Sequence, residues 1–214
     1  MRRTAFIPSS VVFSTLWRVL ALGALIGAVP VRATSVVAPS FNSLVGQADY
    51  IVHAVVKSVR AEMREAGPHR HIVTLVELDV REVISGTPPQ PLVLQMLGGK
   101  VGTEEMVVDG APRFAVGDED ILFVRGNGRQ LNPLVALMHG RYPIKREAGS
   151  GRAFVARSDG APLLSEQDVA APLAAPPTGG PRLARSVAAA LSPEEFASRI
   201  KAARTQDRST SLEN

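Results

Sequence analysis

The sequence predicts an all-β protein, and three observations carry that prediction. Between residues 41 and 157 the apolar residues alternate with polar ones at a period of two, which is typical of strands. Turn-forming dipeptides, among them Asn127-Gly128 and Asp159-Gly160, separate the alternating runs. The chain contains no cysteine, so an apolar core rather than disulfides must support the fold. Short strands with regular turn signals indicate an antiparallel barrel or sandwich.

The clearest strand covers residues 71–84, which are rich in β-branched side chains. Residues 49–59 are apolar on both faces around Ile51–Val56 and predict a central strand. On the strand over residues 71–84, the residues expected to share one face are Ile72, Thr74, Val76, Leu78, Val80 and Ile84. Further candidate strands cover residues 92–97, 105–109, 120–125, 134–139, 141–146 and 152–157.

We place the β-rich domain at residues 34–166, with a short helical feature near its start and a linker and a tail among the residues after it. Residues 40–47 predict a helical turn or two. Residues 167–185 are dominated by alanine, proline and glycine and predict a linker without a core. Residues 205–214 predict a disordered tail.

A carboxyl-terminal helix is predicted between the linker and the tail, over residues 186–204. Ser192 is its expected N-cap, Pro193 takes the first helical position, and Glu195 completes a capping box. Phe196 and Ile200 belong to a narrow apolar stripe, which Ala203 continues. Because a helix of this length is marginal alone in water, we expect it to dock on its own barrel or on a partner.

Residues 1–33 predict a cleavable export signal. Arg2 and Arg3 form a positive start, the run Val19–Val31 is apolar, and Val31-Arg32-Ala33 is a small-residue cleavage pattern. The apolar run is shorter than the roughly 20 residues that span a bilayer, so we expect no membrane span after cleavage. An uncleaved anchor is the alternative. Cleavage after Ala33 predicts a secreted or periplasmic protein.

The charge of the chain lies largely in that signal. The whole chain carries 24 lysines and arginines against 20 acidic residues, a net charge of +4. Arg2, Arg3, Arg18 and Arg32 precede the cleavage point and no acidic residue does, which leaves a neutral mature chain. A neutral chain lacks the positive field that attracts a protein to phosphate backbones. We therefore expect no nucleic-acid partner.

The histidines offer the candidate ligands and bases. His69 and His71 stand two residues apart on a predicted strand and would face one side, as metal chelation requires, but no motif supplies a third ligand. His53 or His139 could serve as the base of a hydrolase whose site is assembled in space, although no serine motif such as G-x-S-x-G accompanies them. Ser150, between two glycines, reads as part of a hairpin loop.

Two further motifs predict structure rather than chemistry. The run Gly98-Gly99-Lys100-Val101-Gly102 lacks the spacing of a phosphate-binding loop and predicts a turn between strands. The run Gly117-Asp118-Glu119-Asp120 lacks the spacing of a calcium loop, and we expect a solvated turn that opens a strand. We assign no catalytic, cofactor-binding or metal-binding residue from the sequence.

The order of several segments resembles a group of uncharacterised exported bacterial proteins with an A-D-x-I-V strand and an F-x-V-G-[DE] motif. The resemblance covers residues 41–144 and implies no activity. Ala54 stands where the group usually has glycine. The segments that carry it are Phe41-Asn42-Ser43-Leu44-Val45, Ala48-Asp49-Tyr50-Ile51-Val52, Thr74-Leu75-Val76, the run 80–86, Gly98-Gly99, Phe114-Ala115-Val116-Gly117-Asp118 and the run Ile121-Leu122-Phe123-Val124.

The same order is loosely similar to the netrin-like module of tissue metalloproteinase inhibitors. That module is an OB-type barrel, so the resemblance implies a small antiparallel OB-like barrel here. Those inhibitors bind the protease zinc through an amino-terminal cysteine, which this chain lacks. The fold is carried over by the resemblance and the inhibitory chemistry is not.

These observations predict an exported, non-enzymatic binding or accessory protein of the cell envelope. An exported protein, such as a secreted protease, is the expected partner, and no cofactor is expected. The alternatives are a metal-binding periplasmic protein that uses His69 and His71, and a hydrolase that uses His53 or His139.

Overall fold

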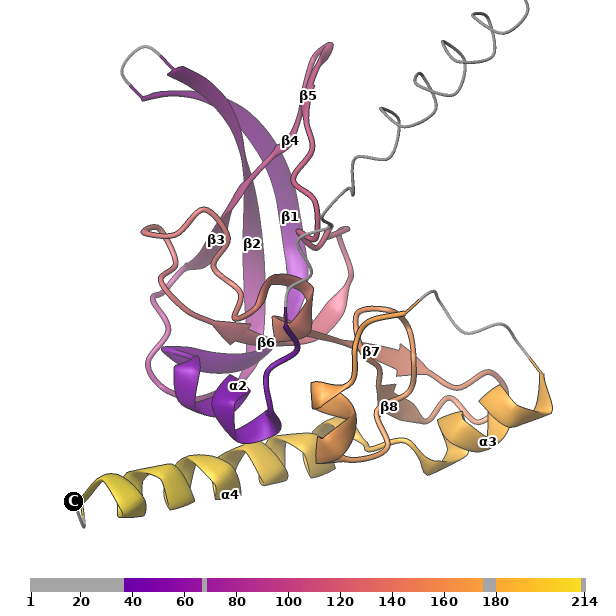
Figure 1. Cartoon of the computed structure of the whole chain (residues 1–214). Coiled ribbons are helices and arrows are strands. Elements are labelled where there is room, and N and C mark those ends of the chain that lie inside the picture. The colour runs from indigo at the N-terminus through magenta and orange to yellow at the C-terminus, as the bar shows by residue number, and fades with distance from the viewer. Residues whose placement is uncertain (1–36, 67–68, 175–179, 213–214) are drawn as a thin grey trace, which may run out of the picture. The chain divides into compact units, whose positions relative to one another are not determined.

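The computed structural model describes residues 37–66, 69–174 and 180–212 (Figure 1). The chain divides into two units, Met1–Ser35 and Val36–Asn214, and the described residues all belong to the second. The predicted export signal, residues 1–33, lies outside the described residues. Within the described residues, no helix combines the length and the apolar character needed to cross a bilayer.

A six-stranded antiparallel sheet forms the centre of the second unit, which confirms the prediction of a mostly β fold. The strands lie in the order β3-β2-β1-β6-β7-β8, and β4 and β5 form a separate two-stranded sheet. The bounds are β1 Tyr50–Ala66, β2 His69–Ser85, β3 Leu92–Leu97, β4 Gly99–Val101, β5 Glu104–Met106, β6 Glu119–Val124, β7 Arg141–Arg146 and β8 Ala153–Val155.

The described strands do not close into a barrel, because β3 and β8 are the ends of the sheet. The end at β3 is covered by the loop that follows β6. Gln95 N–H donates to the Asn127 side-chain oxygen over 3.1 Å, Asn127 Nδ2 donates to the Val93 carbonyl, and Leu97 N–H donates to the Leu131 carbonyl. A loop therefore takes the place of the strand that would close a barrel, and the finer prediction of an OB-like barrel is not confirmed.

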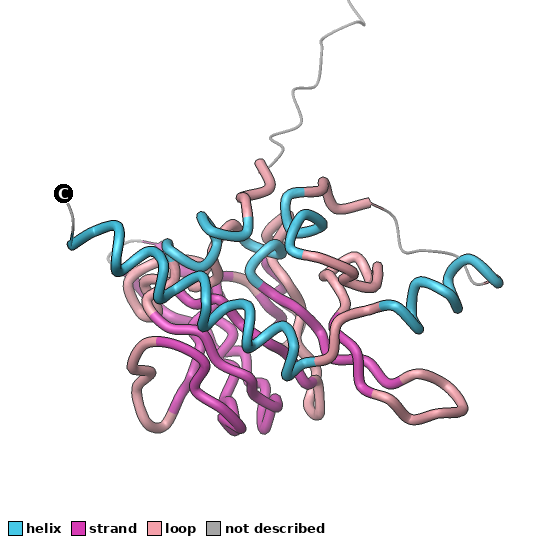
Figure 2. The backbone as a smooth tube through the Cα atoms, turned by 90° about the horizontal axis from the view of Figure 1, so that it is seen from below, coloured by secondary structure: helices cyan, strands magenta, loops and turns pink. Residues whose placement is uncertain are grey.

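Helices cover one face of the sheet (Figure 2). Helix α2, Phe41–Gln47, begins at the N-cap Ser40, and helix α4, Pro193–Leu212, lies beside it. Phe196 of α4 is fully buried, with its ring centroid 5.0 Å from Tyr142 and 6.1 Å from Phe123. The predicted apolar stripe thus docks on the chain's own sheet.

The start of α4 is the predicted capping box. Glu195 N–H donates to Ser192 Oγ over 3.2 Å, and Ser192 N–H donates to the Glu195 carboxylate over 2.8 Å. Two predicted boundaries differ, however. Helix α3, Pro181–Ala189, occupies part of the predicted linker, and α4 continues through residues 205–212 of the predicted tail.

Anchoring side chains explain both differences. The Arg152 guanidinium donates to the carbonyls of Val187 and Ala190 at the end of α3 and satisfies groups that a short helix leaves open. The Arg204 guanidinium donates to the Ala48 carbonyl and to Ser85 Oγ, which ties α4 to the sheet. No glycine or proline follows Pro193 to end that helix.

Two strand predictions were also wrong in detail. Residues 134–139 do not form a strand: Ala136 and Leu137 have φ values of 50° and 57°, and a 3₁₀ helix, η1, spans Leu137–Gly140. Ile84 does not share the face of Val76. The register shifts between the pairs Ala54–Val80 and His53–Glu82, which makes Arg81 an extra residue of β2. From Glu82 onward the even-numbered residues therefore face the helices: Glu82 binds Lys201 of α4, and Ile84 lies in the helix-covered core.

Candidate functional site

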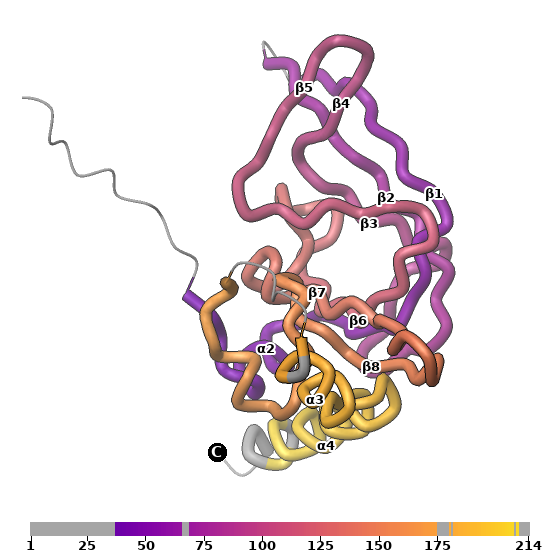
Figure 3. The backbone as a smooth tube through the Cα atoms, turned by 90° about the vertical axis from the view of Figure 1, so that its right-hand side faces the viewer, coloured from indigo at the N-terminus to yellow at the C-terminus, as the bar shows by residue number. Residues whose placement is uncertain are grey.

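A cleft of about 380 Å³, lined mostly by apolar residues, lies on the sheet face that the helices do not cover. Its floor comes from the half of the long β1–β2 hairpin that is nearer the turn and from the end of β3. It includes Val59, Val76 and Met96. The β4–β5 hairpin and residues 106–114 form its walls. Figure 3 shows these segments arching over the strands of the β1–β2 hairpin. A concave apolar site with a few polar groups is the usual form of a binding pocket.

The glycine pair at the start of β4 allows this roof to lie directly on the sheet. Gly99 has φ of +132°, and a Cβ there would stand 2.3 Å from Thr74 Oγ1 and 3.2 Å from the Ala61 Cβ. Thr74 Oγ1 donates to the Gly98 carbonyl over 2.6 Å. The glycine run at residues 98–102, which lacks the spacing of a phosphate-binding loop, therefore lets β4 lie close to the sheet, which builds the cleft. The same run belongs to the β4–β5 hairpin.

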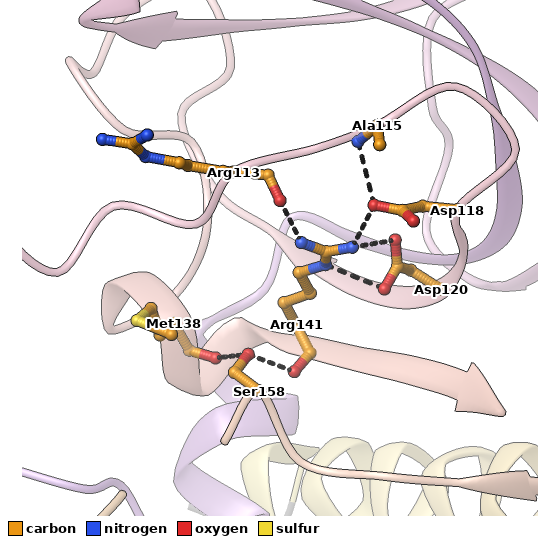
Figure 4. A network of polar contacts seen from close by, with 7 residues as sticks. All are labelled: Arg113, Ala115, Asp118, Asp120, Met138, Arg141 and Ser158. Carbon is orange, nitrogen blue, oxygen red and sulfur yellow. Dashed lines mark hydrogen bonds and ion pairs between the residues drawn. The ribbon is translucent and has the colours of Figure 1, made fainter. Parts of the chain in front are cut away.

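A partly buried arginine, whose side chain is 12% exposed, fixes the wall of the cleft (Figure 4). Arg141, on β7, pairs with Asp120 over 2.8 Å and with Asp118 over 2.7 Å. Its guanidinium also donates to the Arg113 carbonyl and lies 4.3 Å from the centre of the Phe114 ring. Because Arg113 and Phe114 line the cleft, Arg141 holds the wall in place from behind.

The pKa values of the three groups in this network are shifted from their ordinary values. Burial raises the pKa of Asp120, although Arg141 opposes the shift. Burial also acts on Asp118, but the Ala115 N–H and the Arg141 guanidinium outweigh it and lower the pKa of that carboxyl. Burial disfavours the charged form of Arg141, yet Asp120 and Asp118 together raise its pKa. Arg141 and each of the two carboxylates stabilise one another's charged forms, whereas Asp118 repels the charge of Asp120.

The predicted turn does open β6, but the prediction that its carboxylates are solvated was wrong. Asp120 is only 1% exposed and is paired, and Asp118 is partly buried. Glu119 alternates to the other side of the strand. The sequence could not show this pairing, because Arg141 is distant in the chain and reaches the carboxylates only when β6 pairs with β7.

The rim of the cleft carries an excess of positive charge. Lys100 and Arg113 line the cleft with exposed side chains, and neither has an ion pair with another described residue. Glu105 is the acidic residue on the same rim. A ligand that carries a carboxylate beside an apolar group would match this arrangement.

Exposed valines gather around the cleft. Val59 and Val107 line it with exposures of 37% and 61%. Exposed apolar side chains that cluster, unlike scattered ones, mark interaction surfaces.

The four histidines are not brought together with one another or with the cleft. His53, half-buried on β1, lies with Nε2 2.9 Å from the Glu119 carboxylate. His139 is buried in η1, where burial and then Arg157 lower its pKa. His69 and His71 lie at the end of the β1–β2 hairpin, and in the described part of the chain no three histidine or acidic residues gather as metal ligands would.

Sequence reasoning missed the cleft because its residues come from separate elements. Residues 106–114 show neither strand nor helix periodicity, and the predicted strand over residues 105–109 is only β5, Glu104–Met106. The available signal was the adjacent pair Val107-Val108 ahead of Gly110 and Pro112, an apolar run in a loop.

Comparisons with known proteins add no relative. No protein-family model, no curated protein and no solved structure matches this chain. The resemblance described from the sequence therefore stays a prediction.

Proposed function

We propose that the chain is an exported, non-enzymatic binding protein of the cell envelope, and that its cleft takes up an apolar side chain of an exported partner protein. A secreted protease is the partner class that the sequence resemblance suggests. The cleft is the observation that carries the proposal: most of its lining residues are apolar, it is open to solvent, and exposed valines line it.

The volume and chemistry of the cleft support a side chain as occupant. About 380 Å³ lies within the range of small-molecule sites and accommodates one or two apolar side chains with part of a backbone. Lys100 and Arg113 on the rim have no ion pair with another described residue, and they favour an acidic neighbour in the partner. The polar network behind the wall holds the cleft open before a ligand arrives, which limits the cost of ordering.

Site-specific photocrosslinking in the intact envelope tests this function. A photoreactive residue at Val107 lines the cleft, and one at Leu164, which is 42% exposed, serves as the matched control outside it. We expect one dominant adduct from position 107 that is absent from position 164. Equal adducts at both positions, or none at either, would contradict the proposal.

A further inference from the structure

The outer edge of β1 is open beyond the first half of the strand. Val56 is the last residue paired on that side: its N–H donates to the Asp118 carbonyl over 2.8 Å, and its carbonyl accepts from Gly117 N–H over 2.9 Å. From Lys57 to Ala66, β1 pairs with β2 alone among the described residues. An unpaired edge offers a row of backbone donors and acceptors to another strand.

The other two edges of the sheet are covered in contrast. Asn127 and Leu131 occupy the outer side of β3, as described above. On β8, Val155 N–H donates to the Leu191 carbonyl, and the Val155 carbonyl accepts from Leu163 N–H. The second half of β1 has no such cover from the described residues on the side away from β2, and this open edge lies beside the cleft.

The register identifies which groups of the open edge point outward. The Ile72 carbonyl accepts from Gly98 N–H, so Ile72, and by alternation Thr74 and Val76, direct their backbone groups away from β1. Their partners on β1 are Met63, Ala61 and Val59. The N–H and C=O groups of Val59, Ala61 and Met63 therefore point away from β2, toward the open edge.

The edge and the cleft share residues. Val59 and Ala61 present outward backbone groups, and their side chains line the cleft. The opposite face of the same strand carries an ionic row, with Arg60 and Arg64 lying 3.1 Å and 2.8 Å from Glu62. A strand added to this edge would meet apolar groups on one face and charged groups on the other.

We propose that the partner contributes an extended segment that pairs with Val59, Ala61 and Met63 as an added strand of the sheet. Its apolar side chains alternate with polar ones, and the apolar ones enter the cleft. An acidic side chain lies next to Lys100 and Arg113. This inference rests on the proposed function and specifies the chemistry of the partner.

Peptide selection followed by hydrogen exchange tests the added strand. Random peptides of about ten residues, displayed on phage, are selected on the full chain, and the enriched peptides are synthesised. We expect alternating apolar residues and an acidic residue among them. Upon binding, the amides of Val59, Ala61 and Met63 gain protection, whereas those of Arg60 and Glu62, which face β2, change little.

A proline substitution gives the second readout. Val59→Pro removes an outward N–H while the ladder between β1 and β2 stays intact, which edge strands tolerate. Val59→Thr keeps that N–H with a side chain of similar size. We expect the proline variant to bind the synthesised peptide about tenfold more weakly than the threonine variant, the weight of one backbone hydrogen bond.

Each outcome is decisive. The added strand would be overturned if peptides bind without protecting the three amides, or if the two variants bind with equal affinity. The proposed function of the cleft would then still be decided separately, by the crosslinking experiment. Failure to enrich any peptide would also overturn it. Protection that appears without peptide and grows with protein concentration would assign the edge to a second copy of the chain and overturn the proposal.

Discussion

The two halves of β1 belong to one strand but have different surroundings. The first half, up to Val56, lies between β2 and β6 and is covered on both faces, with Ile51 in the helix-covered core and Val52 in the core on the other side. The second half, from Lys57, pairs with β2 alone and borders the cleft. Ile51 and Val52 are fully buried, whereas Val59 is 37% exposed.

This difference separates the stability of the fold from the surface that we propose for binding. The apolar burial that stabilises the sheet is concentrated around the first half, together with α2 and α4. The second half contributes few buried contacts and carries the exposed valines. Substitutions in the two regions should therefore act on different measured quantities. The predictions below run from the largest expected effect on the unfolding free energy to the smallest.

Phe196→Ala should have the largest effect, because it removes a fully buried ring that contacts Phe41, Phe123 and Tyr142. We expect a loss of about 4 kcal/mol in unfolding free energy, measured by urea denaturation. Leu164→Ala, at an exposed position, is the control and should cost about 0.5 kcal/mol or less. Similar losses in the two variants would abolish the contrast between the regions.

Arg141→Met should cost about 3 kcal/mol, because Asp120 would be left buried without its partner. It should also weaken ligand binding at the cleft, since Arg113 and Phe114 lose their support. The double variant Asp120→Asn with Arg141→Met should recover part of the stability but not the binding. If the unfolding free energy of Arg141→Met equals that of wild type, the pairing of Arg141 with Asp120 does not stabilise the fold.

The pH dependence of stability should report the buried histidine of the well-packed region. Burial and then Arg157 lower the pKa of His139 below its ordinary value of 6.5, so the unfolded chain binds the proton more readily. The contribution of His139 is fully present above that value and is lost as the pH falls through the lowered folded-state pKa. Urea denaturation across this range should show a decline that His139→Gln reduces. An identical decline in the variant would assign it to another group.

Val107→Asp should leave the unfolding free energy within about 0.5 kcal/mol of wild type, because Val107 is 61% exposed. Binding of the selected peptides should fall about tenfold or more, since a charge would enter the apolar wall and repel the acidic ligand. Calorimetric titration measures the binding and urea denaturation the stability. A large loss of stability with unchanged binding would reverse the roles of the two regions.

Local chemistry explains which parts of the fold could be predicted from the sequence. The capping box at Ser192 and the alternation around Val76 depend on neighbouring residues, so their signals lie in short windows. The register shift at Arg81, which turns Ile84 to the other face, and the left-handed residues Ala136 and Leu137 depend on tertiary packing, which overrides the local pattern.

The candidate site lay almost wholly beyond such reasoning. Arg141 reaches Asp120 only through the pairing of β6 with β7, and Val59 meets Val107 only because Gly99 allows the chain to cross the sheet. The open edge of β1 follows from which strands are its neighbours, and no periodicity in the sequence encodes that.

The Asn127 amide that covers β3 has a consequence for the ageing of the protein. Asparagine followed by glycine, as at Gly128, readily cyclises to a succinimide and hydrolyses to aspartate or isoaspartate, because glycine leaves the attacking backbone nitrogen unhindered. Here Nδ2 donates to Val93 and Oδ1 accepts from Gln95, and both contacts hold the amide away from that reaction. Once deamidated, the side chain would present a carboxylate to the Val93 carbonyl and release the edge. We expect peptide mapping of aged samples to show isoaspartate at position 127, together with faster hydrogen exchange at the Gln95 amide. Slow covalent damage would then expose the outer edge of β3 as a second edge open to another strand.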